Sequence, residues 1–130
     1  MKTNLDFKKL LTYKLVYLAT PYTKYYIGQE NAANDAAKIA AKLLASGVAI
    51  YSPIVYTHQL AIHGNLNPLD HSLWLPFDQP FLDVCNCLCV LKLKGWQESF
   101  GIDFEIKDFT AKEKMIVYLD PETMQLSKEP

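Results

Sequence analysis

The sequence has neither a surplus of basic residues nor a long apolar run, and both absences narrow what the protein does. Its 13 lysine and arginine residues against 14 acidic ones give a formal net charge of −1, without the basic footprint of nucleic-acid or anionic-membrane binders. No apolar run approaches the roughly 18 residues of a membrane span, and Asp6, Lys8 and Lys9 interrupt any signal-peptide core. We therefore expect a cytoplasmic protein that binds a small molecule or another protein, and neither nucleic acid nor membrane.

Cysteine and histidine form no recognisable metal or disulfide pattern. Cys85, Cys87 and Cys89 occupy alternate positions, so on a strand all three point to one face, where pairing between them is geometrically poor. We interpret them as reduced and buried, because they lack the two-residue spacing and the second ligand pair of zinc sites. The histidines match no zinc pattern, and we expect them on loops or helix surfaces. They are His58, His63 and His71. We expect no metal.

Half of the 130 residues are hydrophobic, which is enough for one core and one domain. Short apolar runs alternate with segments of helical period, and this order implies right-handed crossovers and a parallel sheet. The sequence therefore predicts a three-layer α/β domain over residues 14–121, with a polar leader over 1–13 and a polar, loose tail over 122–130. The expected strands cover 15–19, 48–51, 85–93 and 115–119, and the expected helices cover 30–46 and 99–112.

The stretch from 54 to 80 has no clear period. It allows a helix over 55–62, followed by a turn cluster at 64–68. Asp70 could cap a helix that runs through Trp74, whereas Pro76 and Pro80 suggest a break and a restart.

The run from Ser99 to Glu105 follows an apolar strand and opens a helix, which is where open α/β sheets bind ligands. Gly101 and Glu105 share a helix face, so the Glu105 carboxylate leans over a residue without a side chain. A helix start also attracts anions and favours an ionised carboxylate. These features suit a small, negatively charged substrate. The alternative is a surface helix with Ser99 as its N-cap.

Two motifs resemble those of a known enzyme group. Residues 17–22 are Tyr-Leu-Ala-Thr-Pro-Tyr, and residues 99–105 are Ser-x-Gly-x-x-x-Glu. Over residues 14–120 the chain resembles the nucleoside 2-deoxyribosyltransferases and their relatives that hydrolyse 2′-deoxynucleoside 5′-monophosphates. Residues 74–78 (Trp-Leu-Pro-x-Asp) and 91–101 make it still more similar to an uncharacterised bacterial and phage family within that superfamily.

The resemblance implies a flavodoxin-like (Rossmann-like) fold with a mainly parallel sheet of four to five strands, and no cofactor. It implies that Glu105 attacks the anomeric carbon of a sugar and forms a glycosyl-enzyme ester as the bond to the base breaks. Asp78 would assist departure of the base, and Tyr17 would hydrogen-bond Glu105. Ser99, where transferases of free nucleosides carry an acidic residue, favours a 5′-monophosphate, and Gly101 leaves room for the sugar.

Several of these roles have a structural alternative. Asp78 could cap a helix, Tyr17 could simply pack in the core, and Ser99 could be an N-cap alone.

The loop after the first strand carries further candidate residues. Thr20, Pro21 and Tyr22 are expected to contact the substrate, although an aromatic residue at such a place often only packs. Thr20 stands where many relatives have glycine, and Asn86 and Lys107 stand where aspartate and glycine are frequent. These departures bear on the shape of the pocket and on substrate identity.

The sequence thus favours a hydrolase or deoxyribosyltransferase that acts on a nucleoside or its 5′-monophosphate; both reactions share the glycosyl-enzyme. The resemblance also implies homodimers or homotetramers. The alternatives are a non-catalytic nucleotide or sugar-phosphate binding module, such as a sensor, and an interaction domain whose helix is merely capped.

Overall fold

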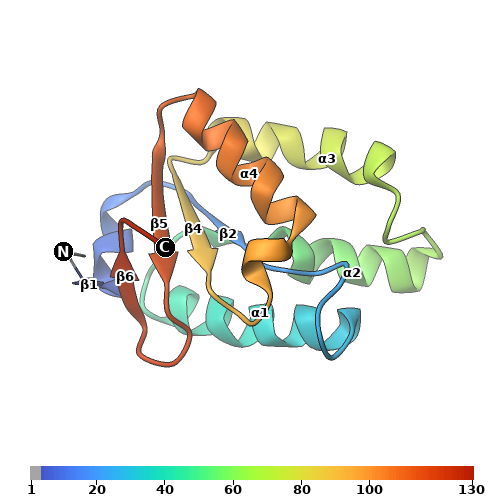
Figure 1. The fold of residues 1–130 in the computed structure, drawn as a ribbon, viewed down its shortest axis with the longest axis horizontal. Helices are drawn as coiled ribbons and strands as arrows, with labels where there is room; N and C mark the ends of the chain where they lie inside the picture. The colour runs from blue at the N-terminus through green and yellow to red at the C-terminus, as the bar shows by residue number, and fades with distance from the viewer. Residues whose placement is uncertain (1–3) are drawn as a thin grey trace.

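The computed structural model describes residues 4–130 and shows one sheet with helices on both faces (Figure 1). The sheet has six strands in the order β1-β6-β5-β4-β2-β3. Four neighbouring strands are parallel, and two antiparallel strands extend one edge. The expected three-layer, flavodoxin-like α/β architecture is confirmed, although the sheet has six strands where four to five were expected. The strands are β1 (Asn4–Asp6), β2 (Val16–Ala19), β3 (Ile50–Tyr51), β4 (Cys87–Leu91), β5 (Met115–Leu119) and β6 (Gln125–Ser127).

Alternate strand residues form two cores, one on each face of the sheet. On β2, Val16 and Leu18 pack in the first core with side chains of α1 (Gln29–Ala45). Tyr17 and Ala19 pack in the second core with side chains of α3 (His71–Val84) and α4 (Phe100–Ala111). Residues of β4 are divided between the two cores in the same way and are all buried, as its continuous apolar run predicts. Tyr17 therefore faces α3 and α4.

The helices bounded by clear sequence signals form where they were expected. Helix α1 presents a small-residue stripe that includes Ala32 and Ala36 to the core, and Gly47, at φ +94°, follows its end in the left-handed conformation. Helix α4 begins after Ser99, whose Oγ accepts a hydrogen bond from Ile102 N at 3.3 Å. Helix α2 (Pro53–Gly64) packs against α1 and contains the helix expected over 55–62.

Helix α3 is continuous, so the break expected at its prolines was wrong. Asp70 caps its start by accepting a hydrogen bond from Ser72 N at 3.1 Å, as expected. Pro76 and Pro80 lie inside the helix, and both are exposed. Because they are four residues apart, the backbone carbonyls that lose their partners lie on the same solvent-facing side, where water satisfies them.

Both ends of the chain add to the sheet, so the expectation of a polar leader and a loose tail was wrong for the described residues. β6 pairs antiparallel with β5 and with β1, and η1 (Phe7–Thr12) follows β1. Leu10 and Leu126 are fully buried in the first core. A single buried leucine in a polar stretch leaves no period in the sequence, which is why these elements were missed. Residues 1–3 of the leader lie outside the described part.

Two expectations about cysteine and histidine need correction. Cys87 and Cys89 share the first core, but Cys85 precedes β4 and packs in the second, so the three do not share one face. His58 is 6% exposed rather than on a surface. The cysteines are free and buried, and residues 4–130 contain no cluster of three potential metal ligands.

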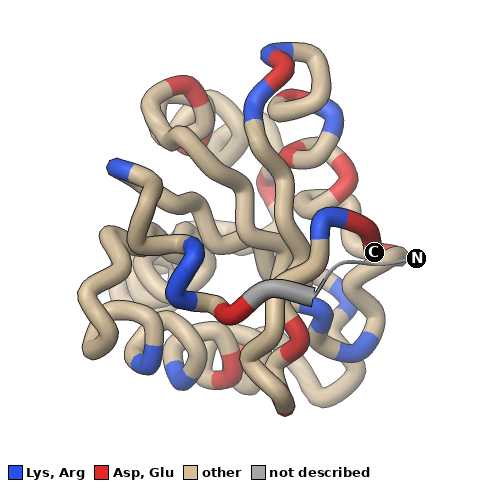
Figure 2. The backbone as a smooth tube through the Cα atoms, turned by 90° about the vertical axis from the view of Figure 1, so that its left-hand side faces the viewer, with Lys and Arg blue, Asp and Glu red and all other residues tan. Residues whose placement is uncertain are grey.

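Charges of both signs are interspersed along the described chain in Figure 2, in agreement with the small net charge. No helix within residues 4–130 has both the length and the apolar character needed to cross a membrane.

Candidate functional site

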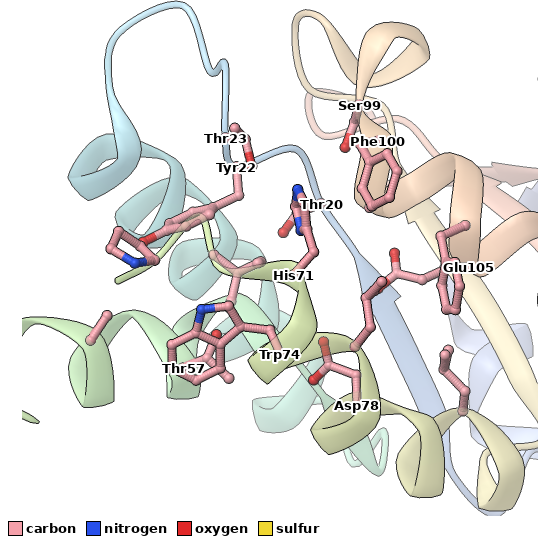
Figure 3. Close-up of a pocket in the computed structure, with 17 residues that line it drawn as sticks. Thr20, Tyr22, Thr23, Thr57, His71, Trp74, Asp78, Ser99, Phe100 and Glu105 are labelled. Atoms are coloured by element: carbon pink, nitrogen blue, oxygen red, sulfur yellow. The ribbon is translucent and has the colours of Figure 1, made fainter. Parts of the chain in front are cut away.

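A pocket lies beyond the carboxyl end of β2, among α2, α3 and α4 (Figure 3). Its empty space is about 730 Å³ when the open mouth is counted. The polar lining includes Thr20, Tyr22, Asp78, Ser99 and Glu105.

Glu105 is the most buried carboxyl group of the pocket, at 9% exposed. The Tyr17 hydroxyl, which is fully buried, donates a hydrogen bond to Glu105 Oε2 at 2.8 Å. Burial raises the pKa of Glu105 to about 8; the Tyr17 hydrogen bond lowers it, and the nearby Asp78 charge raises it further. The pKa of Tyr17 is raised mainly by burial, so this residue remains a hydrogen-bond donor.

The expectation that the helix start keeps Glu105 ionised was therefore wrong. Glu105 lies more than one turn beyond Ser99, and the influence of a helix terminus fades within the first turn. Removal from water is the stronger effect here, and it favours the neutral form of the Glu105 carboxyl group.

Asp78 faces the same pocket from the opposite helix, α3 (Figure 3). It lies in the middle of this helix, so the alternative that it caps a helix start was wrong. Its Oδ1 is buried without a protein partner, and burial raises the pKa of Asp78 to about 6. Two carboxyl groups with raised pKa values thus converge on one pocket.

Ser99 and Gly101 form the wall at the start of α4. Ser99 is the N-cap, as one alternative held, and it also lines the pocket. A Cβ built on Gly101 would meet nothing closer than Ser99 Oγ at 4.0 Å, so packing within the chain does not require glycine at this position. The missing side chain instead leaves space in the pocket, as expected.

The loop after β2 supplies one buried polar group and one aromatic ring to the pocket. Thr20 is 4% exposed, and its Oγ1 has no protein partner. The Tyr22 hydroxyl and His58 Nδ1 are hydrogen-bonded at 2.7 Å, and the two rings meet edge to face. Tyr22 is thus fixed by a residue that sequence reasoning placed on a surface. Pro21 does not line this pocket but an adjoining one.

Part of the lining was missed from the sequence. Most of it comes from α2 and α3, whose sequence has no clear period, so no pattern placed these side chains beside Glu105, and Phe100 and Phe104 add to it from α4. The rings of His71 and Phe100 lie 4.4 Å apart between centroids and connect α3 to the start of α4. The missed residues include Thr57, His71, Leu75, Phe100 and Phe104.

The remaining departures from the resemblance lie outside the pocket lining. Lys107 is exposed and forms an ion pair with Asp103 at 2.8 Å. Asn86 Oδ1 accepts a hydrogen bond from Leu15 N at 3.0 Å, ahead of β2. Of the departures, only Thr20 contacts the pocket.

A family model described as "Domain of unknown function (DUF1937)" matches residues 14–120. No curated protein matches the chain.

Proposed function

The chain belongs to the DUF1937 family, a domain of unknown function, and we propose that its pocket cleaves the N-glycosidic bond of a deoxynucleoside 5′-monophosphate or a close analogue. The observation that carries the proposal is the pairing of Glu105 and Asp78, two carboxyl groups from facing helices with raised pKa values. Such pairs are the machinery of retaining glycoside hydrolysis.

In the proposed first step, a Glu105 oxygen attacks the anomeric carbon and forms an ester. The carbon–nitrogen bond breaks, its electron pair stays on the base nitrogen, and protonated Asp78 donates a proton to the base. In the second step water attacks the same carbon, Asp78 accepts a proton from it, and Glu105 leaves as a carboxylate. A second base in place of water would make the reaction a transfer.

Proton placement gives the reaction a recognisable pH dependence. Attack needs Glu105 ionised and Asp78 protonated, but burial favours the opposite arrangement, with pKa values of about 8 and 6. The reactive arrangement is then the minor one of the two at neutral pH. Base release should rise up to about pH 6, stay level, and fall above about pH 8.

The phosphate end of the ligand is proposed to lie at Ser99. The start of α4 leaves N–H groups without intrahelical partners, and the Ser99 hydroxyl can turn from its cap to donate to a phosphate oxygen. The unpartnered Thr20 Oγ1 is a second donor within the same pocket.

A non-catalytic nucleotide or sugar-phosphate sensor is the second candidate. The raised pKa of Glu105 favours it, because a protonated carboxyl group binds by hydrogen bonds but does not attack carbon.

The two candidates are separated by incubating the protein with the four deoxynucleoside 5′-monophosphates and detecting free base by chromatography. We expect release of at least one base by the wild type and none by Glu105→Gln, which keeps the shape of the side chain. The matched control is Glu122→Gln, an exposed glutamate on the turn between β5 and β6 that lines neither this pocket nor the adjoining one. Binding of a nucleotide without release of any base would leave only the sensor.

Self-association and a cytoplasmic location are part of the proposal. An apolar groove between α1 and α2, lined by Leu44, Val55 and Tyr56, carries no charged side chain and suits a second copy. The three buried, free cysteines fit a reducing compartment. A monomer by light scattering at micromolar concentration would contradict self-association.

A further inference from the structure

A second pocket adjoins the first and shares the wall formed by Tyr22, Thr23, Ser99 and Phe100. It is the wider of the two, with about 1030 Å³ of empty space including its open mouth. Ser99 lines both pockets, whereas Glu105 lines only the first. A ligand whose sugar faces Glu105 therefore directs whatever follows its phosphate into the second pocket.

The second pocket is lined by two lysines that come from different loops. Lys24 belongs to the β2–α1 loop, and Lys94 follows β4. The only acidic residue in its lining is Glu98. Within residues 4–130, neither lysine forms a salt bridge, whereas Lys107 and Lys112 do. The pocket thus has two cations that the described protein leaves without a carboxylate partner.

A cation–π contact connects the two loops across this pocket. The Lys94 ammonium lies 4.7 Å from the centroid of the Tyr26 ring. The loop that carries Tyr26 is itself anchored, because the neighbouring Tyr25 hydroxyl donates a hydrogen bond to Asp35 on α1 at 2.8 Å. Lys94 is therefore held against the Tyr26 ring within the lining of this pocket.

We propose that the second pocket is an anion subsite for the phosphate beyond the first one, so that the ligand class is a nucleoside 5′-diphosphate or a nucleotide extended through its phosphate. The sequence contains no arginine, so lysines supply the positive charge that such a group needs. The inference rests on the proposed function for the placement of the sugar at Glu105.

The test compares binding of deoxynucleoside 5′-monophosphates and 5′-diphosphates by calorimetry, in a Glu105→Gln background so that no base is released. We expect the diphosphate to bind about tenfold more tightly, the contribution of one charge-assisted contact. Lys24→Gln combined with Lys94→Gln should reduce this preference to less than threefold and change monophosphate affinity by less than threefold. Lys107→Gln, an exposed lysine on the outer side of α4, is the matched control and should keep the preference.

Equal affinity for the two nucleotides would overturn the subsite, as would an equal loss of both affinities in the double variant. Failure of this inference is distinguishable from failure of the proposed function. A preference for the diphosphate without base release by the wild type contradicts only the proposed glycosidase activity. Base release without this preference contradicts only the proposed phosphate subsite. Absence of binding by either nucleotide overturns both.

Discussion

At the scale of single residues, the chemistry of the pocket depends on how little water reaches Glu105. A buried carboxyl group binds its proton more tightly, and the Tyr17 hydroxyl opposes this by donating to the ionised form. The two effects together set how much nucleophile is present at a given pH. They also connect the function of the site to the stability of the fold.

Replacement of Glu105 by glutamine should stabilise the protein at alkaline pH. The folded-state pKa of Glu105, about 8, lies above the ordinary value of 4.5, so the folded protein binds this proton more tightly than the unfolded chain does. The contribution of this proton to the free energy of unfolding is therefore fully present below about pH 4.5 and is lost as pH rises through 8. Glutamine has no proton to lose and still accepts the Tyr17 hydrogen bond. We expect the free energy of unfolding of Glu105→Gln to exceed that of the wild type by ~5 kcal/mol at pH 9 and to differ little at pH 4.5.

Chemical denaturation at the two pH values measures this difference. The control is Glu98→Gln, an exposed glutamate outside α4, for which the two pH values should give the same result. An equal effect of Glu105→Gln at both pH values would contradict the burial of an ionisable group.

Replacement of Tyr17 by phenylalanine should impair base release in a pH-dependent way. Loss of the hydroxyl removes the one hydrogen bond that lowers the pKa of Glu105, so less carboxylate is present at neutral pH. For each unit by which the pKa rises, we expect base release to fall about tenfold at pH 7 and about twofold at pH 9. A purely structural role for Tyr17 would instead reduce base release by the same factor at every pH. A pH profile of initial rates separates these two outcomes.

At the scale of elements, α3 and α4 hold the two carboxyl groups, and a polar clamp at their far ends joins them. Gln79 donates hydrogen bonds to Asp83 and Asp108, each at 3.0 Å. Lys112 bonds the same two aspartates, with 2.8 Å to Asp108 Oδ2. Gln79 adjoins Asp78 in the sequence, so the clamp bears directly on where that carboxyl group lies relative to Glu105.

Replacement of Lys112 by methionine should loosen this clamp, because the stem remains but the ammonium is lost. We expect the free energy of unfolding to fall by about 1 kcal/mol and base release to fall more than stability alone explains. Lys107→Met breaks an exposed pair on the same helix and should change stability by less than about 0.5 kcal/mol. Identical behaviour of the two variants would show that the clamp does not position the site.

The elements predicted from sequence are those with strong local signals. The alanine-rich helix ended by Gly47 and the helix capped by Ser99 form as expected, because small-residue periodicity and capping act within a few residues. Helix α3 was misjudged because tertiary packing maintains the helix in spite of two prolines, each of which weakens an isolated helix. The exposure of Pro76 and Pro80 depends on tertiary packing and cannot be read locally.

The candidate site was predictable in part for the same reason. Glu105, Ser99 and Gly101 were placed from strand and helix positions together with the family resemblance, and the structure brings them to one pocket. Tyr17 does not line the pocket and reaches the site only through its hydrogen bond to Glu105. The ring of His71 and the support that His58 gives Tyr22 depend on how α2 and α3 fold back, and no short-range pattern encodes that path.

At the scale of the whole molecule, the two ends of the chain close one edge of the sheet. β6 lies between β1 and β5, so the C-terminal strand connects the N-terminal segment to the parallel strands (Figure 1). Leu126 is the fully buried residue of this strand and packs in the first core, on the opposite face from the pocket.

Truncation of Leu126 to alanine should therefore destabilise the protein without affecting nucleotide binding. Removal of a buried leucine side chain costs about 2–5 kcal/mol, whereas Leu11→Ala, at a residue 47% exposed, should cost less than about 1 kcal/mol. Thermal unfolding and calorimetry of the two variants test this. A loose tail, as first expected from the sequence, would make the two substitutions equivalent.

The most direct test of the proposed function is the mass of the protein after a rapid acid quench during reaction with deoxynucleoside 5′-monophosphates. The covalent mechanism predicts a fraction of wild-type protein heavier by one deoxyribose phosphate unit, with the added mass on the peptide that contains Glu105, and no such species in Glu105→Gln. Free base released by both proteins at the same rate, or an adduct on any other residue, would contradict the assignment of Glu105 as the nucleophile.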